Sequence, residues 1–313
     1  MKSKCLIVDD MHPVIIKKLE EIGMEVDYKP DISRESTLEI IHKYHGLIVR
    51  SKFKIDRLLL ENASKLRFIA RAGAGMDQID VAEVEKRNVQ LFNAPEGNRD
   101  ALAEHTLALI LAVLNNIVPA NSEVKSKIWK REANRGYELG QQTVAIIGCG
   151  FMGRAVVDKL GAFGCKVLVY DRDFQIQNLP AYASNASMAE IEEHADLISF
   201  HIPLDEANRG LVDKKYLSKF KKNIWVINTA RGEIMPMKDL LELLKSGKVL
   251  GAGLDVLENE KFNTYTVEQT KYFDALAELP NVIFTPHVGG WTFESYVRIS
   301  EVLADKIKNS GLI

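Results

Sequence analysis

The feature that most constrains this chain is a glycine-rich stretch at residues 142–157, in which a short apolar strand runs directly into Gly-x-Gly-x-x-Gly and then into apolar residues at helical spacing. The glycines are Gly148, Gly150 and Gly153. In a strand–turn–helix of this kind the first glycine makes the tight turn, the second lets the backbone approach a pyrophosphate, and the third lets the helix pack close to the strand. The helix N-terminus then faces the phosphates.

Glycines at this spacing also occur in ordinary turns, so the neighbouring sequence has to support the assignment. A second expected strand, at residues 166–170, ends in Asp171, where a carboxylate can bond the ribose hydroxyls of the adenosine. The stretch therefore predicts dinucleotide binding, with a structural turn as the alternative. A carboxylate at this position repels the 2′-phosphate of NADP and favours NAD, although the adjacent Arg172 could accommodate that phosphate.

The composition indicates a globular protein of nearly balanced charge. The 313 residues are 46% hydrophobic and 27% charged, and no apolar run reaches the length of a membrane-spanning helix. The 41 basic and 43 acidic residues form no basic stripe for nucleic acid and no polybasic membrane anchor. The apolar run near the N-terminus is only a strand long, which is too short for a signal peptide. We expect a cytoplasmic protein without nucleic-acid or membrane partners.

The cysteines give no sign of a metal site or of disulfides. Cys5, Cys149 and Cys165 are far apart and lack the spacing of metal ligands. We interpret them as reduced packing residues.

Residues 4–94 alternate between short apolar runs and amphipathic stretches, which predicts a parallel sheet with helices on both faces. This block carries no glycine fingerprint of its own and is therefore the better candidate for a substrate domain. Its expected strands are residues 4–8, 24–28, 46–50, 66–70 and 89–92, and two of its helical stretches are residues 12–22 and 33–44.

A long apolar helix is expected at residues 100–118, ending at Pro119, and it would lead into the second domain. The polar segment 124–138 follows, with Trp129 as its main anchor, and alternation of strands and helices then resumes. The expected strands of this block are residues 143–147, 166–170, 197–201, 224–228, 249–254 and 282–285. A last helix at residues 292–308 can cross back to the first domain and make it discontinuous.

Three loops that follow strands of the second block carry groups suited to chemistry, and such loops line the ligand crevice of open parallel sheets. Residues 228–232 contain Arg231, a planar cation suited to a carboxylate. Residues 255–260 are acidic, and residues 285–290 contain His287. A histidine held against a carboxylate can donate a proton to a carbonyl oxygen near neutral pH. Taken singly, Arg231 could be a solvated charge and His287 a surface or core histidine.

Together these motifs resemble the D-isomer-specific 2-hydroxyacid dehydrogenase family, and the resemblance spans nearly the whole chain. It implies two doubly wound parallel-sheet α/β domains, with a Rossmann NAD-binding domain (99–288) inserted in a flavodoxin-like substrate domain (1–98 plus 289–313). It also implies a homodimer joined through the cofactor domain. The matching segments are residues 49–51, 72–77, 93–98, 148–153, 201–204, 228–232, 255–260 and 285–287.

By this resemblance Arg231 orients a keto acid, His287 donates the proton and Glu260 holds His287, with Glu258 as the alternative carboxylate. Asp255 matches the position that contacts the nicotinamide amide. The other cofactor contacts implied are Gly148, Gly150, Phe151, Met152, Gly153, Asp171, His201, Pro203, Thr229, Ala230 and His287. The substrate contacts implied are Arg50, Ala72, Gly73, Ala74, Gly75 and Asn93.

The chain departs from the family pattern at a few positions. Lys261 replaces the proline that follows the catalytic glutamate, and residues 262–277, just after Glu260, form a longer stretch than usual. Asn208 stands where a threonine is common. Trp291 replaces a smaller residue and either shapes the substrate pocket or packs the hinge.

Within the family the pattern is most similar to short D-3-phosphoglycerate dehydrogenases without a regulatory domain, for which the chain leaves no room after its last helix. Arg50 matches a basic position that faces the substrate phosphate, and Lys52 is close to it. A strand-end surface charge is the other reading of Arg50. We expect an NAD-dependent oxidoreductase of serine biosynthesis, with glycerate or hydroxypyruvate as rival small-molecule substrates. An NADH-sensing corepressor-like binding protein is the alternative of another class.

Overall fold

The computed structural model describes residues 2–172 and 176–312. The chain divides into two compact units. Unit 1 consists of Met1–Arg99 and Gly290–Ile313, and unit 2 is Asp100–Gly289. The sequence of unit 2 therefore interrupts that of unit 1.

Within the described residues, unit 1 is built on a five-stranded parallel sheet of order β2-β1-β3-β4-β5, which is the flavodoxin-like order. Strands buried on both faces are almost continuously apolar, as the buried β3 is. The strands are β1 (Lys4–Ile7), β2 (Glu25–Tyr28), β3 (Gly46–Val49), β4 (Phe68–Arg71) and β5 (Gln90–Asn93).

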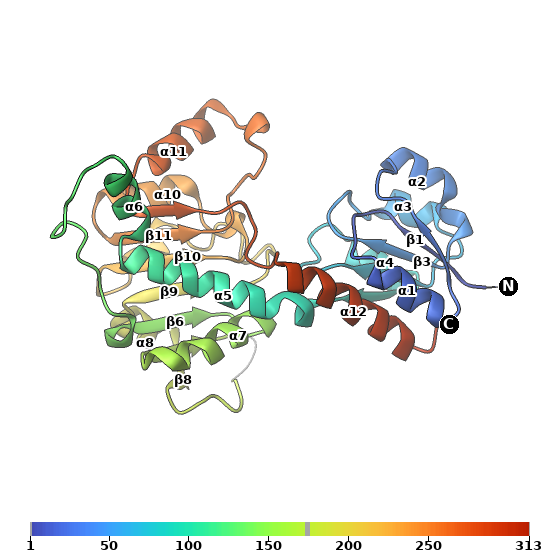
Figure 1. Ribbon diagram of the computed structural model, residues 1–313, viewed down its shortest axis with the longest axis horizontal. Helices are drawn as coiled ribbons and strands as arrows, with labels where there is room; N and C mark the ends of the chain where they lie inside the picture. Colours follow the sequence, from blue (N-terminus) through green and yellow to red (C-terminus); the bar gives the residue numbers. More distant parts are fainter. Residues whose placement is uncertain (1, 173–175, 313) are drawn as a thin grey trace. The chain divides into compact units, whose positions relative to one another are not determined.

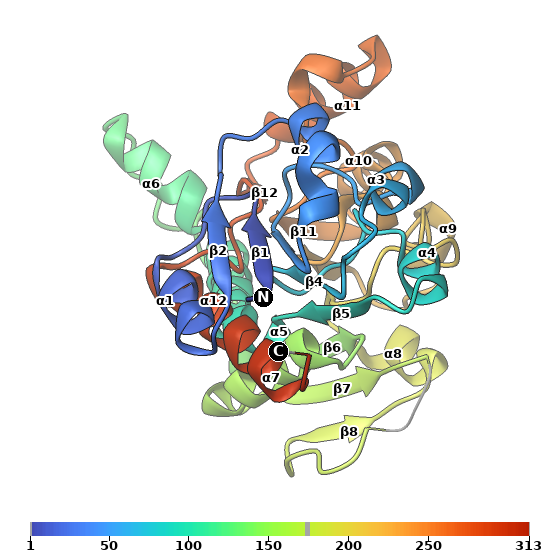
Figure 2. The same ribbon diagram turned by 90° about the vertical axis from the view of Figure 1, so that its right-hand side faces the viewer.

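Helices cover both faces of this sheet and bring the two ends of the sequence together. The C-terminal helix α12 (Phe293–Asn309) packs beside α1 (Val14–Glu21), as both ribbon views show (Figures 1 and 2). Its buried side chains, including Ile299 and Leu303, join the core formed with β1 and β4. Helix α12 therefore belongs to unit 1 together with the first block of the chain. The other helices are α2 (Arg34–Ile40), the 3-10 turn η1 (Ile41–Lys43), α3 (Arg57–Asn62) and α4 (Val81–Lys86).

Unit 2 is built on a parallel sheet of seven strands in the described part of the chain, in the order β12-β11-β10-β9-β6-β7-β8. The order reverses at the β6–β9 pair, which is the switch point of a Rossmann fold. Figure 2 shows β6, β7 and β8 side by side at one end of it. The strands are β6 (Thr143–Ile147), β7 (Lys166–Tyr170), β8 (Ala183–Asn185), β9 (Leu197–Phe200), β10 (Ile224–Asn228), β11 (Val249–Leu254) and β12 (Val282–Phe284).

The helices that pack on this sheet bury apolar stripes, as α10 does with four leucines. They are α7 (Phe151–Leu160), α8 (Met188–His194), α9 (Lys214–Ser218), α10 (Met237–Lys245) and α11 (Val267–Ala277), with short 3-10 turns η2 (Leu139–Gln141), η3 (Gly161–Phe163), η4 (Gly232–Ile234) and η5 (Phe262–Thr264). The long stretch at residues 262–277 is therefore a helix and its 3-10 approach. Phe262, Tyr265 and Phe273 form an aromatic cluster that contacts Phe284 beneath it.

The expected helix at residues 100–118 was wrong in its start, its end and its continuity. Helix α5 (Pro95–Leu114) stops before Asn116, which adopts a left-handed conformation (φ 53°), and α6 (Ile117–Lys125) starts after it. Pro119 lies in the first turn of α6, where its missing N–H costs no helical hydrogen bond. Trp129 does not anchor the segment that follows, since it is 83% exposed.

No single helix among the described residues is long and apolar enough to cross a membrane. Helices α5 and α6 meet the length and composition only as a pair, and they are bent by 63° at their break.

Candidate active site

The loops that follow β10, β11 and β12 lie beside one another because these parallel strands are neighbours in the sheet. The first two loops are in direct contact at Gly232. A Cβ on that residue would lie 1.9 Å from the carbonyl carbon of Leu257 and 2.5 Å from the backbone nitrogen of Glu258. Only a glycine fits there, so the sequence Arg-Gly places Arg231 against the acidic loop.

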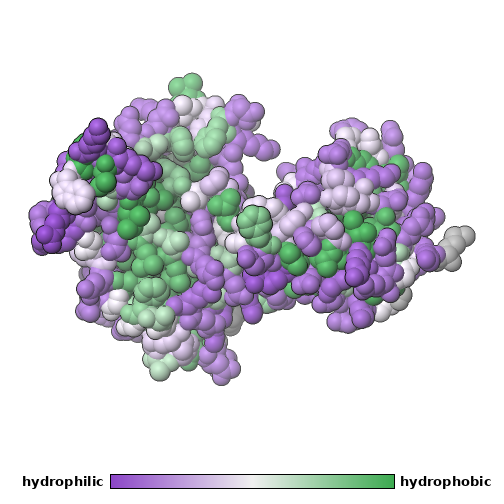
Figure 3. All heavy atoms as spheres, in the orientation of Figure 1, coloured by the Kyte–Doolittle hydropathy of each residue, from purple (hydrophilic) through white to green (hydrophobic). Residues whose placement is uncertain are grey.

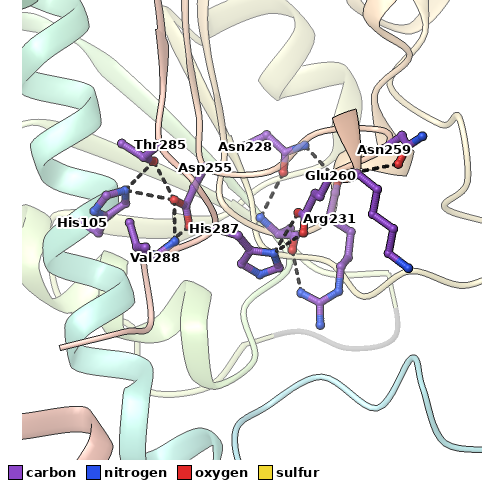
Figure 4. A network of polar contacts seen from close by, with 12 residues as sticks. His105, Asn228, Arg231, Asp255, Asn259, Glu260, Thr285, His287 and Val288 are labelled. Carbon is purple, nitrogen blue, oxygen red and sulfur yellow. Dashed lines mark hydrogen bonds and ion pairs between the residues drawn. The ribbon is translucent and has the colours of Figure 1, made fainter. Parts of the chain in front are cut away.

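His287 and Glu260 form a hydrogen-bonded pair across two of these loops (Figure 4). The Nδ1 atom of His287 lies 2.8 Å from Oε1 and 3.0 Å from Oε2 of Glu260. The backbone of His287 is left-handed, with φ 54°, a conformation that is uncommon for residues other than glycine and concentrates at functional sites. Both side chains are 46% exposed, so a ligand can reach the pair.

Asp255 holds the histidine loop in this conformation. It is 2% exposed, and its Oδ1 accepts hydrogen bonds from the Thr285 hydroxyl at 2.6 Å and the Val288 backbone N–H at 3.0 Å. Its Oδ2 accepts from the Gly289 N–H at 2.8 Å. His105 Nε2 lies 3.3 Å from Oδ1 and 2.8 Å from Thr285 Oγ1. Burial alone would raise the pKa of Asp255, but these hydrogen bonds together lower it below its usual value.

Both oxygens of the Asp255 carboxylate thus accept hydrogen bonds from residues of unit 2. The expected contact of Asp255 with a nicotinamide amide stays a prediction. His105, on α5, was not singled out from the sequence. The available signal was a pair of polar residues, His105 and Thr106, within an apolar helical stretch. Thr106 bonds to Thr229, whose Oγ1 lies 3.1 Å away, so His105 and Thr106 together contact all three loops.

The Arg231 loop is closed by its own hydrogen bonds. Asn228 accepts from the Ala230 N–H at 3.0 Å and donates to the Arg231 carbonyl at 2.9 Å. The half-buried guanidinium of Arg231 donates through Nη1 to the Ala230 carbonyl at 2.6 Å. Ala230 is almost fully buried, so its predicted cofactor contact would be made through the backbone.

Of the two candidate carboxylates, only Glu260 contacts His287 in the described structure. Glu258 accepts a hydrogen bond from the backbone N–H of Met237 at 2.8 Å. Met237 is the first residue of α10, where a carboxylate satisfies a free N–H and interacts favourably with the helix dipole. Lys261, which replaces the family proline, donates through its N–H to Asn259 and does not displace Glu260.

The glycine loop after β6 has the geometry that a dinucleotide requires. Gly148 has φ 88° and would clash with the His201 carbonyl if it carried a side chain, and a Cβ on Gly153 would lie 2.0 Å from the Gly148 carbonyl oxygen. Gly150 is different, because a Cβ there would meet no protein atom within 4 Å. The missing side chain of Gly150 therefore keeps space open for a ligand at the start of α7, as a pyrophosphate needs. Phe151 and Met152 open that helix.

Asp171 lies at the end of β7 and accepts a hydrogen bond from the Cys149 N–H at 2.8 Å through Oδ2. Its carboxylate is therefore fixed beside the glycine loop, as a ribose-binding group has to be. Arg172, the residue that could favour NADP, forms an ion pair with Asp205 at 3.3 Å.

His201 and Pro203 follow β9, next to the glycine loop. The ring of His201 is turned into the domain, with Nε2 2.9 Å from Ser199 Oγ and with a buried Nδ1 that has no hydrogen-bond partner among the described residues. Burial lowers the pKa of His201 to about 3, so the ring is neutral at physiological pH. Asn208 donates to the Pro203 carbonyl at 2.9 Å, which explains an amide at this position.

The expected substrate residues all lie in unit 1. Gly73 has φ 132°, and a Cβ on it would lie 1.9 Å from Nη1 of Arg71, so the loop of Ala72, Gly73, Ala74 and Gly75 runs beside a second cation that the sequence did not reveal. Asn93 donates to the Ala74 carbonyl at 2.8 Å and fixes this loop. Arg50 follows β3 and packs on Trp291.

Comparison with known proteins agrees with the fold. Residues 107–289, more than half of the chain, match the family model described as "D-isomer specific 2-hydroxyacid dehydrogenase, NAD binding domain". The chain is 35% identical over 97% of its length to the D-3-phosphoglycerate dehydrogenase of Methanocaldococcus jannaschii, and 36% identical over 85% of its length to that of Bacillus subtilis. It covers 57% and 49% of those proteins, so it spans about half the length of the curated relatives it matches.

Among solved structures, the D-lactate dehydrogenase of Aquifex aeolicus, in complex with NAD and lactic acid, superposes with a TM-score of 0.84. The two sequences are 25% identical, and the match covers 98% of this chain and 94% of that one. Unit 2 contains the family's NAD-binding domain, and its glycine loop has the space that this cofactor needs. The chain belongs to the D-isomer specific 2-hydroxyacid dehydrogenase family.

Proposed function

We propose that the protein is an NAD-dependent dehydrogenase that interconverts a D-2-hydroxy acid and its 2-keto acid. The observation that carries this proposal is the His287–Glu260 pair, which stands with the Arg231 loop at the carboxyl ends of adjacent strands of an NAD-binding domain. A proton donor, a cation and a hydride-carrying cofactor are what carbonyl reduction requires.

The proton is handled by His287. Because Nδ1 faces the Glu260 carboxylate, Glu260 accepts the Nδ1–H and leaves Nε2 as the nitrogen that exchanges a proton with the substrate oxygen. In reduction the imidazolium donates from Nε2 to the carbonyl oxygen, and in oxidation neutral Nε2 accepts the hydroxyl proton. Glu260 fixes the orientation of the ring and stabilises its charged form.

The other residues bind and orient. Arg231 offers a guanidinium to the substrate acid group. Gly150 and the N-terminus of α7 would hold the cofactor's pyrophosphate, and Asp171 its ribose. The bound cofactor would supply or accept the hydride at its nicotinamide ring. Unit 1 is the substrate domain in this proposal, with its Ala72–Gly75 backbone directed to the substrate carboxylate.

For the substrate we propose 3-phosphoglycerate, oxidised to 3-phosphohydroxypyruvate, as the first step toward serine. Support comes from the curated relatives, whose names are D-3-phosphoglycerate dehydrogenase, and from Arg50 as a cation in the substrate domain. D-Glycerate and hydroxypyruvate form the rival pair, because they differ only in lacking the phosphate.

The test is NADH consumption by the purified protein with 3-phosphohydroxypyruvate and with hydroxypyruvate at matched concentrations. We expect turnover with a preference for the phosphorylated acid, and a loss of about 10²- to 10⁴-fold in His287→Ala. Turnover that survives in His287→Ala would remove the assignment of the acid–base residue. Tight NADH binding with no turnover on any keto acid would favour the corepressor-like alternative.

We also propose that the protein is a cytoplasmic homodimer joined through unit 2. Figure 3 shows hydrophobic side chains gathered over α5 and α6, and the exposed residues include Ile117 and Val118. Trp129, in the segment that follows α6, is also exposed. Such a patch on a globular protein marks an interface more often than chance exposure. Light scattering of Val118→Glu against the unchanged protein tests it, and an unaltered mass would argue against this surface.

A further inference from the structure

The cation at the end of β3 lacks a carboxylate partner among the residues that the structure describes. The Cζ atom of Arg50 lies 4.4 Å from the ring centroid of Trp291. Its Nη1 is buried and has no hydrogen-bond partner within the described chain. An aromatic face attracts a guanidinium but brings no full negative charge to neutralise it. In the described structure no carboxylate is paired with the guanidinium of Arg50, so an incoming anion can pair with it.

Among the described residues, Asp9 supplies the one carboxylate that bonds to this segment, and backbone N–H groups occupy it. Oδ2 of Asp9, which is 7% exposed, accepts hydrogen bonds from the N–H groups of Arg50 at 2.5 Å, Ser51 at 3.2 Å and Lys52 at 3.3 Å. Gln78 donates to the Arg50 carbonyl. These bonds fix the direction in which the Arg50 side chain leaves the sheet, and Asp9 stays committed to the loop.

The ring that holds the guanidinium is itself fixed by the start of α12. Trp291 directly precedes Thr292, which forms a reciprocal capping pair with Ser295. The Trp291 ring meets the ring of Tyr296 edge-on at 5.2 Å. The Tyr296 hydroxyl donates to Oδ2 of Asp10 at 2.9 Å. The indole thus has a defined position, while 43% of its surface remains exposed beside the cation.

We propose that Trp291 is a positioning residue that makes the enzyme selective for a phosphorylated substrate, because it holds Arg50 as an uncompensated cation at the end of β3. This proposal rests on the proposed function, in which Arg50 faces the substrate phosphate. A planar guanidinium can bond two oxygens of a phosphomonoester dianion, whereas a hydroxymethyl arm gains no charge interaction. A flexible Arg50 without the ring would lose part of this preference through its greater freedom.

The experiment compares Trp291→Leu, which removes the aromatic face, with Trp291→Phe, which keeps one, each with and without Arg50→Ala. The readout is the ratio of kcat/KM for 3-phosphohydroxypyruvate to that for hydroxypyruvate, with NADH saturating. We expect Trp291→Leu to lower this ratio about 2- to 30-fold through KM for the phosphorylated acid, at unchanged kcat and unchanged KM for NADH. Trp291→Phe should restore most of the ratio, and melting temperatures check that all variants are folded.

The double variant tells whether Trp291 acts by positioning Arg50 or only by packing. In the Arg50→Ala background, Trp291→Leu should have no further effect on the ratio, since the cation it positions is gone. An unchanged ratio in Trp291→Leu alone, or an equal loss with and without Arg50, would overturn the proposal.

Calorimetric titration of 3-phosphoglycerate and D-glycerate into the cofactor-free protein distinguishes this proposal from the proposed function. If the protein shows no turnover but binds the phosphorylated acid more tightly, and Trp291→Leu removes that difference, the proposed function fails and the role of Trp291 stands. If turnover prefers the phosphorylated acid and depends on Arg50 but not on Trp291, only the present proposal fails. If neither turnover nor binding discriminates between the two acids, both fail.

Discussion

Nδ1 of His287 lies 2.8 Å from Oε1 of Glu260, while Glu258, two residues earlier, directs its carboxylate to the first N–H of α10. Two glutamates of one short loop therefore have different hydrogen-bond partners. One orients an imidazole and the other closes a helix N-terminus, and this difference makes each a control for the other.

Glu260→Gln should lower kcat for keto-acid reduction by about 10²-fold at neutral pH, because the neutral amide no longer stabilises the imidazolium of His287. Glu258→Gln removes the same charge but keeps an oxygen for the Met237 N–H, so its kcat should be nearly unchanged. Steady-state kinetics of the two variants side by side decide this. Equal losses in both would mean that the charge of the loop, rather than the contact with His287, matters.

Gly150→Ala should leave the fold intact and weaken NAD binding, since an added Cβ meets no protein atom but enters the space expected for the pyrophosphate. We expect an unchanged melting temperature and at least about a tenfold rise in KM for NADH, the equivalent of about 1.4 kcal/mol. Gly153→Ala, by contrast, should destabilise the fold, because its Cβ would lie 2.0 Å from the Gly148 carbonyl oxygen and α7 would have to move. Its melting temperature should fall. A normal KM in Gly150→Ala would mean that the cofactor does not pass over this glycine.

Much of this arrangement follows from the sequence because it depends on local pattern. The bounds of β10 and β11 match the expected strands, since buried parallel strands are continuous apolar runs. Motif spacing also favoured Glu260 over Glu258. Strand β8, with the sequence Ala-Ser-Asn, was missed because three largely polar residues carry no such signal.

Other features depend on contacts between distant residues and could not be read from the sequence. His105 and Asp255 are 150 positions apart, and only the fold shows that one supports the other. The break between α5 and α6 depends on the left-handed backbone of Asn116, which competes with an otherwise helical pattern. Likewise, the packing of Trp291 on Arg50 joins residues that are far apart in the sequence, and only the fold shows it.

His201 should make the folded protein sensitive to mild acid. Burial lowers its pKa from 6.5 to about 3. Below about pH 6.5 the unfolded chain therefore binds a proton at this side chain, whereas the folded protein does not. The free energy of unfolding that comes from keeping His201 neutral is fully present above pH 6.5. It is lost as the pH falls toward 3, by at most about 1.4 kcal/mol per pH unit. Urea unfolding at pH 7 and pH 5 should show a smaller loss in His201→Gln than in the unchanged protein. The same substitution at the exposed His194 serves as the control, and identical pH dependence in all three proteins would contradict the prediction.

Asp171 should decide between NAD and NADP. Its carboxylate is fixed by the Cys149 N–H at the end of β7, where it would repel a 2′-phosphate, whereas Arg172 is paired with Asp205. In Asp171→Asn we expect the ratio of kcat/KM for NADPH to that for NADH to rise about tenfold or more, which corresponds to relief of about 1.4 kcal/mol of charge repulsion. In Arg172→Ala the ratio should stay low, because the repelling carboxylate is still present. If Arg172→Ala instead lowers a substantial activity with NADPH, the arginine rather than the aspartate sets the cofactor preference, and the ion pair with Asp205 opens when NADPH binds.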